Sequence, residues 1–73
     1  SAQFEFIESG QERVVMYTRE NEKESVLVVL NVQETSAFIQ LPKAFEEATL
    51  VFGDPWTGSL PAYGAAVLVK PKK

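Results

Sequence analysis

Carboxylates are the side chains of this sequence that could most readily take part in catalysis. The chain has 73 residues, of which ten are Asp or Glu, and it contains no histidine and no cysteine. It therefore lacks the usual general base and the usual thiolate nucleophile. Hydrolysis of a glycoside by paired carboxylates needs two of them about 5 to 9.5 Å apart in a cleft. Glu46 and Glu47 are adjacent in a predicted loop, and Glu5 and Glu8 lie near the end of a predicted strand. We expect all four to be solvated surface acids, so no catalytic residue is predicted.

The sequence also offers little for a metal or a cofactor. Its four glycines are scattered and match neither nucleotide-binding fingerprint. Asp54 could bring one carboxylate to a calcium site, but such a site needs several oxygen ligands. A role in the turn fits Asp54 better. We therefore predict no metal site and no cofactor.

Two aromatic residues, Trp56 and Tyr63, are the candidates for contact with a ligand. Exposed on a turn, they could form a platform for a sugar ring. The competing interpretation is that Trp56 packs over the end of the core, which we favour because buried aromatic side chains dominate the energetics of small cores. Asn31 ends the most apolar segment and is expected to hydrogen bond with the backbone of a turn.

The charge balance argues against one class of partner, and the length of the apolar runs argues against a second. Residues 1–69 hold four basic residues against all ten acidic ones, and the other three lysines lie at the C-terminal end. This balance argues against nucleic acid, and a solubilising end explains the lysines better than a phosphate-binding arm. No apolar run approaches the roughly 18 residues of a membrane-spanning helix. We predict neither a nucleic-acid partner nor a membrane partner.

Short apolar segments separated by turn signals, about ten residues apart, predict the fold. The predicted strands are residues 4–8, 13–19, 25–32, 37–41, 49–52, 59–61 and 65–70. Residues 43–48 are predicted to form a loop with one helical turn that tucks Phe45 inward. This pattern indicates an all-β chain, a small antiparallel β-sandwich of six to seven strands.

Alternation within the strands predicts which side chains share a face. Phe4 and Phe6 should lie on one face and Ile7 on the other. Residues 26–30 are apolar without alternation, which is typical of a central strand covered on both faces. A polar stretch, residues 20–24, is predicted to form a five-residue hairpin loop.

Three sequence motifs, in this order, resemble a known family. They are Val14-Val15-Met16-Tyr17-Thr18-Arg19, then Val26-Leu27-Val28-Val29-Leu30-Asn31, and finally Leu60-Pro61-Ala62-Tyr63-Gly64-Ala65-Ala66-Val67-Leu68. Together they resemble the C-terminal all-β domain of α-amylase-type glycoside hydrolases, a group that includes α-glucosidases and neopullulanases. The likeness runs from about Phe4 to Val69. Pro61-Ala62-Tyr63 departs from the pattern, because many relatives place the proline next to the aromatic residue.

The resemblance implies a Greek-key sandwich that follows a catalytic (β/α)₈ barrel, with the catalytic carboxylates on that barrel and outside this chain. Residues 1–73 would then be a single C-terminal accessory domain of a hydrolase acting on starch-like α-glucans or maltooligosaccharides. Its partner would be the barrel, with an α-glucan as a second candidate. Arg19, Tyr17 and Asn31 match positions that recur in the family, and the resemblance implies a structural role for them. An apolar patch facing the barrel is expected near Phe4, Phe6 and Ile7. The alternatives are a carbohydrate-binding module using Trp56 and Tyr63, and a generic β-sandwich interaction domain.

Overall fold

A computed structural model describes residues 3–53 and 57–72 of the chain. Within them lie seven β-strands and one 3₁₀ turn. The elements are β1 (Gln3–Ile7), β2 (Val14–Glu20), β3 (Glu24–Asn31), β4 (Ala37–Phe38), η1 (Lys43–Phe45), β5 (Thr49–Phe52), β6 (Ser59–Leu60) and β7 (Ala65–Pro71). The predicted all-β class is confirmed, and the described helical structure is limited to η1.

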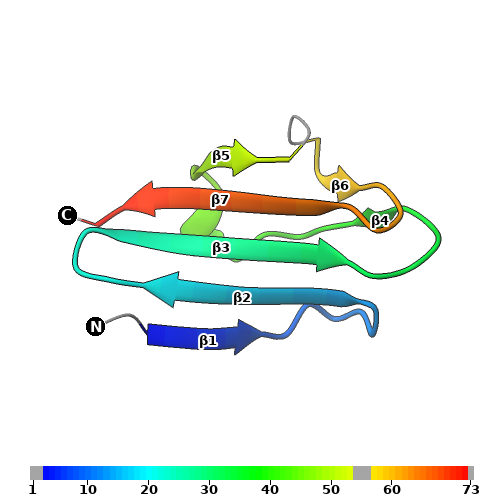
Figure 1. The fold of residues 1–73 in the computed structure, drawn as a ribbon, viewed down its shortest axis with the longest axis horizontal. Helices are drawn as coiled ribbons and strands as arrows, with labels where there is room; N and C mark the ends of the chain where they lie inside the picture. The colour runs from blue at the N-terminus through cyan, green and yellow to red at the C-terminus, as the bar shows by residue number, and fades with distance from the viewer. Residues whose placement is uncertain (1–2, 54–56, 73) are drawn as a thin grey trace.

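The strands form a five-stranded sheet and a small two-stranded sheet (Figure 1). The order of the large sheet is β1-β2-β3-β7-β5, and β4 pairs with β6 in the small one. Every pairing is antiparallel. The apolar strand β3 lies at the centre of the large sheet, as its composition predicts, with β1 and β5 at the edges.

The core lies on one face of the large sheet, which we call the inner face. Burial alternates along β2 and β3, so that Val14, Met16, Leu27 and Val29 are buried while the residues between them are not. The two-stranded sheet and η1 cover this face. They contribute Ala37, Phe45 and Leu60 to the same buried cluster, and Ile39, directly after β4, adds a fourth buried side chain. Phe45 therefore points inward, as predicted.

Two local features differ from the expectations. The fourth strand is Ala37–Phe38 only, although the Ile39 N–H still donates to the Gly58 carbonyl directly beyond it. The hairpin loop is shorter than five residues, since β2 runs to Glu20 and β3 begins at Glu24. Its tight turn is held by the Asn21 side chain, whose Oδ1 accepts hydrogen bonds from two backbone N–H groups of the hairpin.

Other expectations fall outside what the structure tests. Asp54 and Trp56 lie outside the described residues. The Greek-key connection remains a prediction. In the described residues, no helix is long and apolar enough to cross a membrane.

Candidate interaction surface

The second face of the large sheet, which we call the outer face, carries apolar side chains across all five strands. Residues that pair directly across strands project to the same face, so the strand register assigns the members of each face. Three cross-strand rows form most of the outer face: Phe4, Arg19, Val26, Val69 and Thr49; Phe6, Tyr17, Val28, Val67 and Phe52; and Val15, Leu30 and Ala65. The pair Glu24 and Pro71 continues it at the hairpin end.

No described segment covers the outer face. In Figure 1 η1 and the chain that leads to it from β4 lie behind the large sheet, and the face turned to the viewer is crossed by none of the segments drawn in colour. The side chains at the two sheet edges are accordingly exposed, with Phe4 at 56%, Phe6 at 67% and Phe52 at 63%. Those on the central strands are half-buried by their own neighbours. A largely apolar exposed surface of this kind is a candidate interaction site.

Three aromatic rings gather at the β1 end of the outer face. The ring centroids of Phe4 and Tyr17 are 4.8 Å apart, and those of Phe6 and Tyr17 are 5.9 Å apart. Phe4 and Phe6 meet edge to face at 5.4 Å. Aromatic pairs at these separations attract each other beyond the area they bury. The cluster therefore holds large apolar surfaces in place while leaving them open to a partner.

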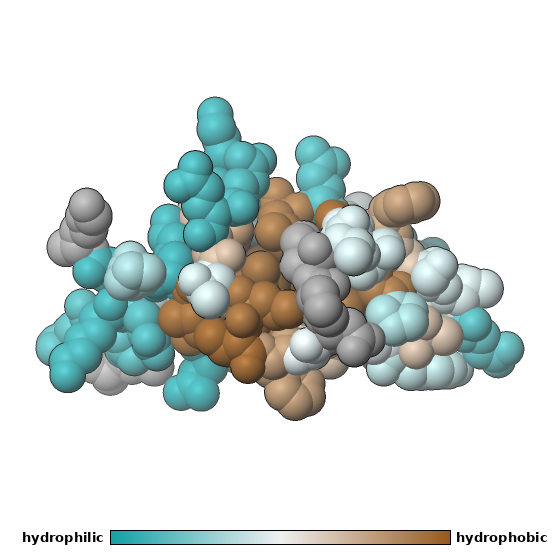
Figure 2. Space-filling view, turned by 90° about the horizontal axis from the view of Figure 1, so that it is seen from above, coloured by the Kyte–Doolittle hydropathy of each residue, from teal (hydrophilic) through white to brown (hydrophobic). Residues whose placement is uncertain are grey.

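The opposite edge of the sheet is also apolar. Figure 2 looks onto the edge formed by β5, and hydrophobic side chains gather in the middle of that view. Val51 is exposed at an irregularity in the pairing of β5 with β7. Gly53 follows at once with φ 112°, and a Cβ there would lie 2.6 Å from the carbonyl oxygen of Ala65. Only glycine allows the chain to leave β5 this close to β7.

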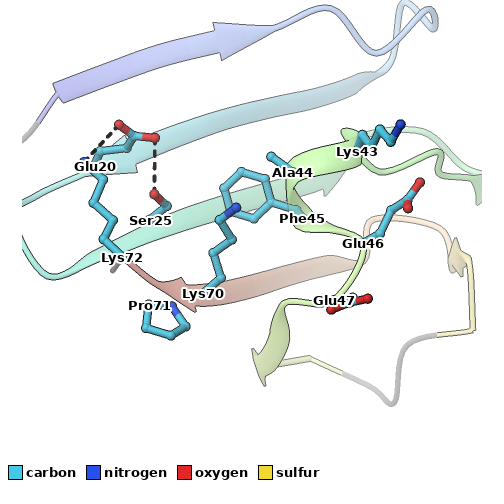
Figure 3. A pocket seen from close by; sticks show the side chains of 10 residues that line it. All are labelled: Glu20, Ser25, Lys43, Ala44, Phe45, Glu46, Glu47, Lys70, Pro71 and Lys72. Carbon is cyan, nitrogen blue, oxygen red and sulfur yellow. Dashed lines mark hydrogen bonds and ion pairs between the residues drawn. The ribbon is translucent and has the colours of Figure 1, made fainter.

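The four carboxylates that the sequence singles out lie on the surface. Glu5, Glu8, Glu46 and Glu47 are all exposed, as predicted. Glu46 and Glu47 line a groove of about 810 Å³ beside η1. Figure 3 shows both side chains pointing away from Glu20, the third acid of that groove. The described residues contain no group of three or more potential metal ligands.

The rest of the groove beside η1 is held by internal contacts. Glu20 forms an ion pair with Lys72 at 3.4 Å and accepts a hydrogen bond from the Ser25 hydroxyl at 3.2 Å (Figure 3). The Lys70 ammonium lies 5.6 Å from the centroid of the Phe45 ring, within the range of a cation–π contact. These contacts fasten the C-terminal end of β7 to the β2–β3 hairpin and to η1.

Asn31 ends β3, and its side chain hydrogen bonds to the backbone of two turns. Its side chain is 1% exposed, and its Nδ2 donates to the carbonyl oxygens of Thr35 and Pro61 at 2.9 Å and of Leu60 at 3.3 Å. Its Oδ1 is buried and accepts no hydrogen bond from the described residues. The predicted bonding of Asn31 to turn backbone is confirmed, and these contacts give it a structural role.

Tyr63 is 67% exposed and lies in a β-turn that the Gly64 N–H closes by donating to the Pro61 carbonyl. At this third position of the turn Tyr63 has a φ of 56°, which is unusual for a bulky residue. Gly or Asn is favoured at such a position. The structure thus presents an aromatic ring to solvent on a strained backbone. Whether Trp56 lies beside it falls outside the described residues.

Sequence reasoning located only part of the outer face. Phe4 and Phe6 lie on it as expected, whereas Ile7 is half-buried against the core and does not belong to the patch. The face extends instead over β2, β3, β7 and β5. The signal for it in the sequence is the unbroken apolar run of residues 26–30, which predicts two covered faces. In the described chain only the inner one is covered.

The comparisons with known proteins agree with the resemblance found in the sequence. A family model described as the C-terminal domain of maltogenic amylase matches residues 4–67. No curated protein and no solved structure gives a significant match. The matched segment begins on β1, whose aromatic residues open the outer face, and reaches into β7, which lies next to the central strand. The chain therefore belongs to the family of maltogenic amylase C-terminal domains.

Proposed function

We propose that this chain is a single, non-catalytic C-terminal accessory domain of an α-amylase-type glycoside hydrolase. The enzyme would act on starch-like α-glucans or maltooligosaccharides through a catalytic (β/α)₈ barrel earlier in the same polypeptide. The role of the accessory domain is to pack its outer face against that barrel and stabilise it. Family membership supports the identity of the partner, and the outer face supports the role.

The uncovered apolar surface of the outer face is the observation that carries this proposal. Interfaces between domains of one chain bury about 600–1,500 Å². Burying one large apolar side chain contributes about 1.5–3 kcal/mol. Phe4 and Phe6 lie on β1, the first strand of the chain, so a polypeptide arriving from an upstream domain reaches the sheet at the edge of this face. A domain preceding β1 is thus well placed to cover it.

The test compares two exposed phenylalanines in the full-length hydrolase. Phe6 lies on the outer face. Phe38 lies on β4 and is 85% exposed, because its neighbour Ala37 faces the core and Phe38 points away from the core. Phe6→Asp should lower the melting temperature of the enzyme by several degrees, because it places a charge in the interface. Phe38→Asp should leave that temperature within about a degree.

The active site provides the second readout. At temperatures where the enzyme is folded, Phe6→Asp should leave kcat on a short maltooligosaccharide unchanged, because the proposed role is stabilisation. Equal melting temperatures for the two variants would contradict the docking role. If both variants kept full stability while affinity for polymeric starch fell, the domain would be a substrate handle.

A second candidate function, contact with carbohydrate, is favoured by Tyr63. Its ring is exposed although its backbone conformation disfavours a bulky residue, and such strain is often retained at functional sites. Trp56 is the other sequence candidate for this contact. Titration of the chain with maltoheptaose, followed by the NMR signals of the β6–β7 turn, tests the idea. Saturable shifts that disappear in Tyr63→Ala would support it, and unchanged spectra at millimolar sugar would reject it.

A further inference from the structure

We infer that the surface that docks on the outer face presents a carboxylate to Arg19. This inference rests on the proposed docking of the catalytic domain and specifies the chemistry of that partner. Arg19 is the only charged residue in the three cross-strand rows of the outer face. Its direct cross-strand neighbours are Phe4 on β1 and Val26 on β3. Its direct cross-strand neighbours are therefore apolar, while Glu20, Asn21 and Glu24 line the same pocket as Arg19 toward the hairpin end.

Arg19 has no counter-charge in the described part of the chain. The ion pair found there joins Lys72 to Glu20, and the cation–π contact joins Lys70 to Phe45. Arg19 also donates no side-chain hydrogen bond to the described residues, and its side chain is exposed. In solution, water satisfies its five N–H donors.

Docking removes that water. Covering the apolar face would therefore bury the positive charge of Arg19. Burying an unpaired charge is strongly unfavourable, whereas a carboxylate matches the guanidinium with two parallel hydrogen bonds. A partner that is apolar opposite the aromatic cluster and acidic opposite Arg19 fits this face. Such a pair also fixes the register of docking, because a shifted partner would leave both charges unpaired.

Glu24 is the internal rival for this role. It pairs with Pro71 two residues before Val26, so it lies on the same face at the hairpin end. It is half-buried and forms no ion pair with Arg19 in the structure. A rearrangement on docking could bring the two together, and the experiment separates this case from a carboxylate on the partner.

The experiment measures the melting temperature of the full-length hydrolase carrying Arg19→Met, Arg19→Lys, Glu24→Gln or Lys43→Met. Lys43 is exposed on η1, on the covered side of the sheet, so its variant controls for the loss of one positive charge. Arg19→Met should lower the melting temperature by several degrees, because it leaves the partner's carboxylate buried and unpaired. Arg19→Lys should restore part of that loss. Glu24→Gln and Lys43→Met should change little.

Hydrogen exchange of the β2 and β3 amides reports whether each variant keeps its sheet, so that misfolding is not mistaken for lost docking. An unchanged or higher melting temperature for Arg19→Met, with Phe6→Asp still destabilising, would overturn the carboxylate while leaving the docking role intact. A loss in Glu24→Gln equal to that in Arg19→Met would also overturn it, because the counter-charge would then be internal. If Phe6→Asp had no effect, the docking role and this inference would both fail.

Discussion

The side-chain amide of Asn31 and the carbonyl oxygen of Pro61 form a 2.9 Å hydrogen bond that joins the end of β3 to the turn before β7. The same amide donates to Thr35 in the turn that follows β3. One buried side chain thus ties the turn after β3 to the turn before β7. The backbone N–H of Asn31 adds a bond to the Gly64 carbonyl at 2.9 Å.

Replacing Asn31 should therefore be costly. Asn31→Ala leaves the part-buried carbonyl groups of both turns without their donor, and each such loss costs up to about 1–3 kcal/mol. We expect a drop of about 2–4 kcal/mol in the free energy of unfolding of the chain, measured by urea titration. Asn21→Ala is the matched control: its Oδ1 also accepts two hydrogen bonds, but the hairpin around it is exposed. A loss there as large as that at Asn31 would show that burial is not the cause.

Tyr63 should be a site where stability can be gained. Its φ of 56° is tolerated better by Asn than by a bulky aromatic residue. Tyr63→Asn should raise the free energy of unfolding of the chain by about 0.5–1 kcal/mol. Ala62→Asn, one position earlier and without a positive φ, should bring no gain. A loss of stability in Tyr63→Asn would mean that the tyrosine ring packs against the domain more than its exposure indicates.

Two glycines with positive φ should respond differently to the same substitution. Gly10 has a φ of 81° and open space where a Cβ would stand, whereas Gly53 would bring its Cβ to 2.6 Å from the Ala65 carbonyl oxygen. Gly10→Ala should cost about 1–2 kcal/mol from backbone strain alone. Gly53→Ala should cost clearly more, because β5 must also move away from β7. Equal losses in urea unfolding would show that β5 shifts freely at the sheet edge.

The sequence predicted the local features of this fold better than the global ones. Alternation placed Phe4 and Phe6 on one face of β1 and Ile7 on the other, because the side-chain period of a strand is fixed by its backbone. Asn31 could be predicted because a polar residue that ends an apolar strand needs partners. The insertion of β7 between β3 and β5 is non-local, and no local pattern encodes which distant strands pair.

The outer face could be predicted only in part from the sequence, for a related reason. Residues 26–30 indicated a strand with two covered faces, and the structure places that strand at the centre of the sheet. Which face the chain covers by itself depends on where the β4–β6 layer and η1 pack. That choice is made by tertiary contacts of Phe45 and Leu60 and not by any local pattern.

The last prediction uses two neighbouring valines on β3 to measure whether the outer face is covered. Val29 is fully buried on the inner face, and Val28 is half-buried on the outer face. In the 73-residue chain, Val29→Ala should cost about 2–3 kcal/mol, from the lost methyl groups and the cavity they leave. Val28→Ala should cost less than about 1 kcal/mol there, because its methyl groups are still partly in water.

Docking of the catalytic domain on the outer face should reduce the difference between the two losses of stability. In the full-length hydrolase, a partner over the outer face would bury Val28 as well, so the loss from Val28→Ala should rise toward that from Val29→Ala. The two substitutions remove the same atoms from adjacent positions of one strand, so differences in strand propensity largely cancel. Urea unfolding of both variants in both contexts gives the four values needed. A Val28→Ala loss that stayed the same in the chain and in the full-length enzyme would mean that the outer face remains open to solvent.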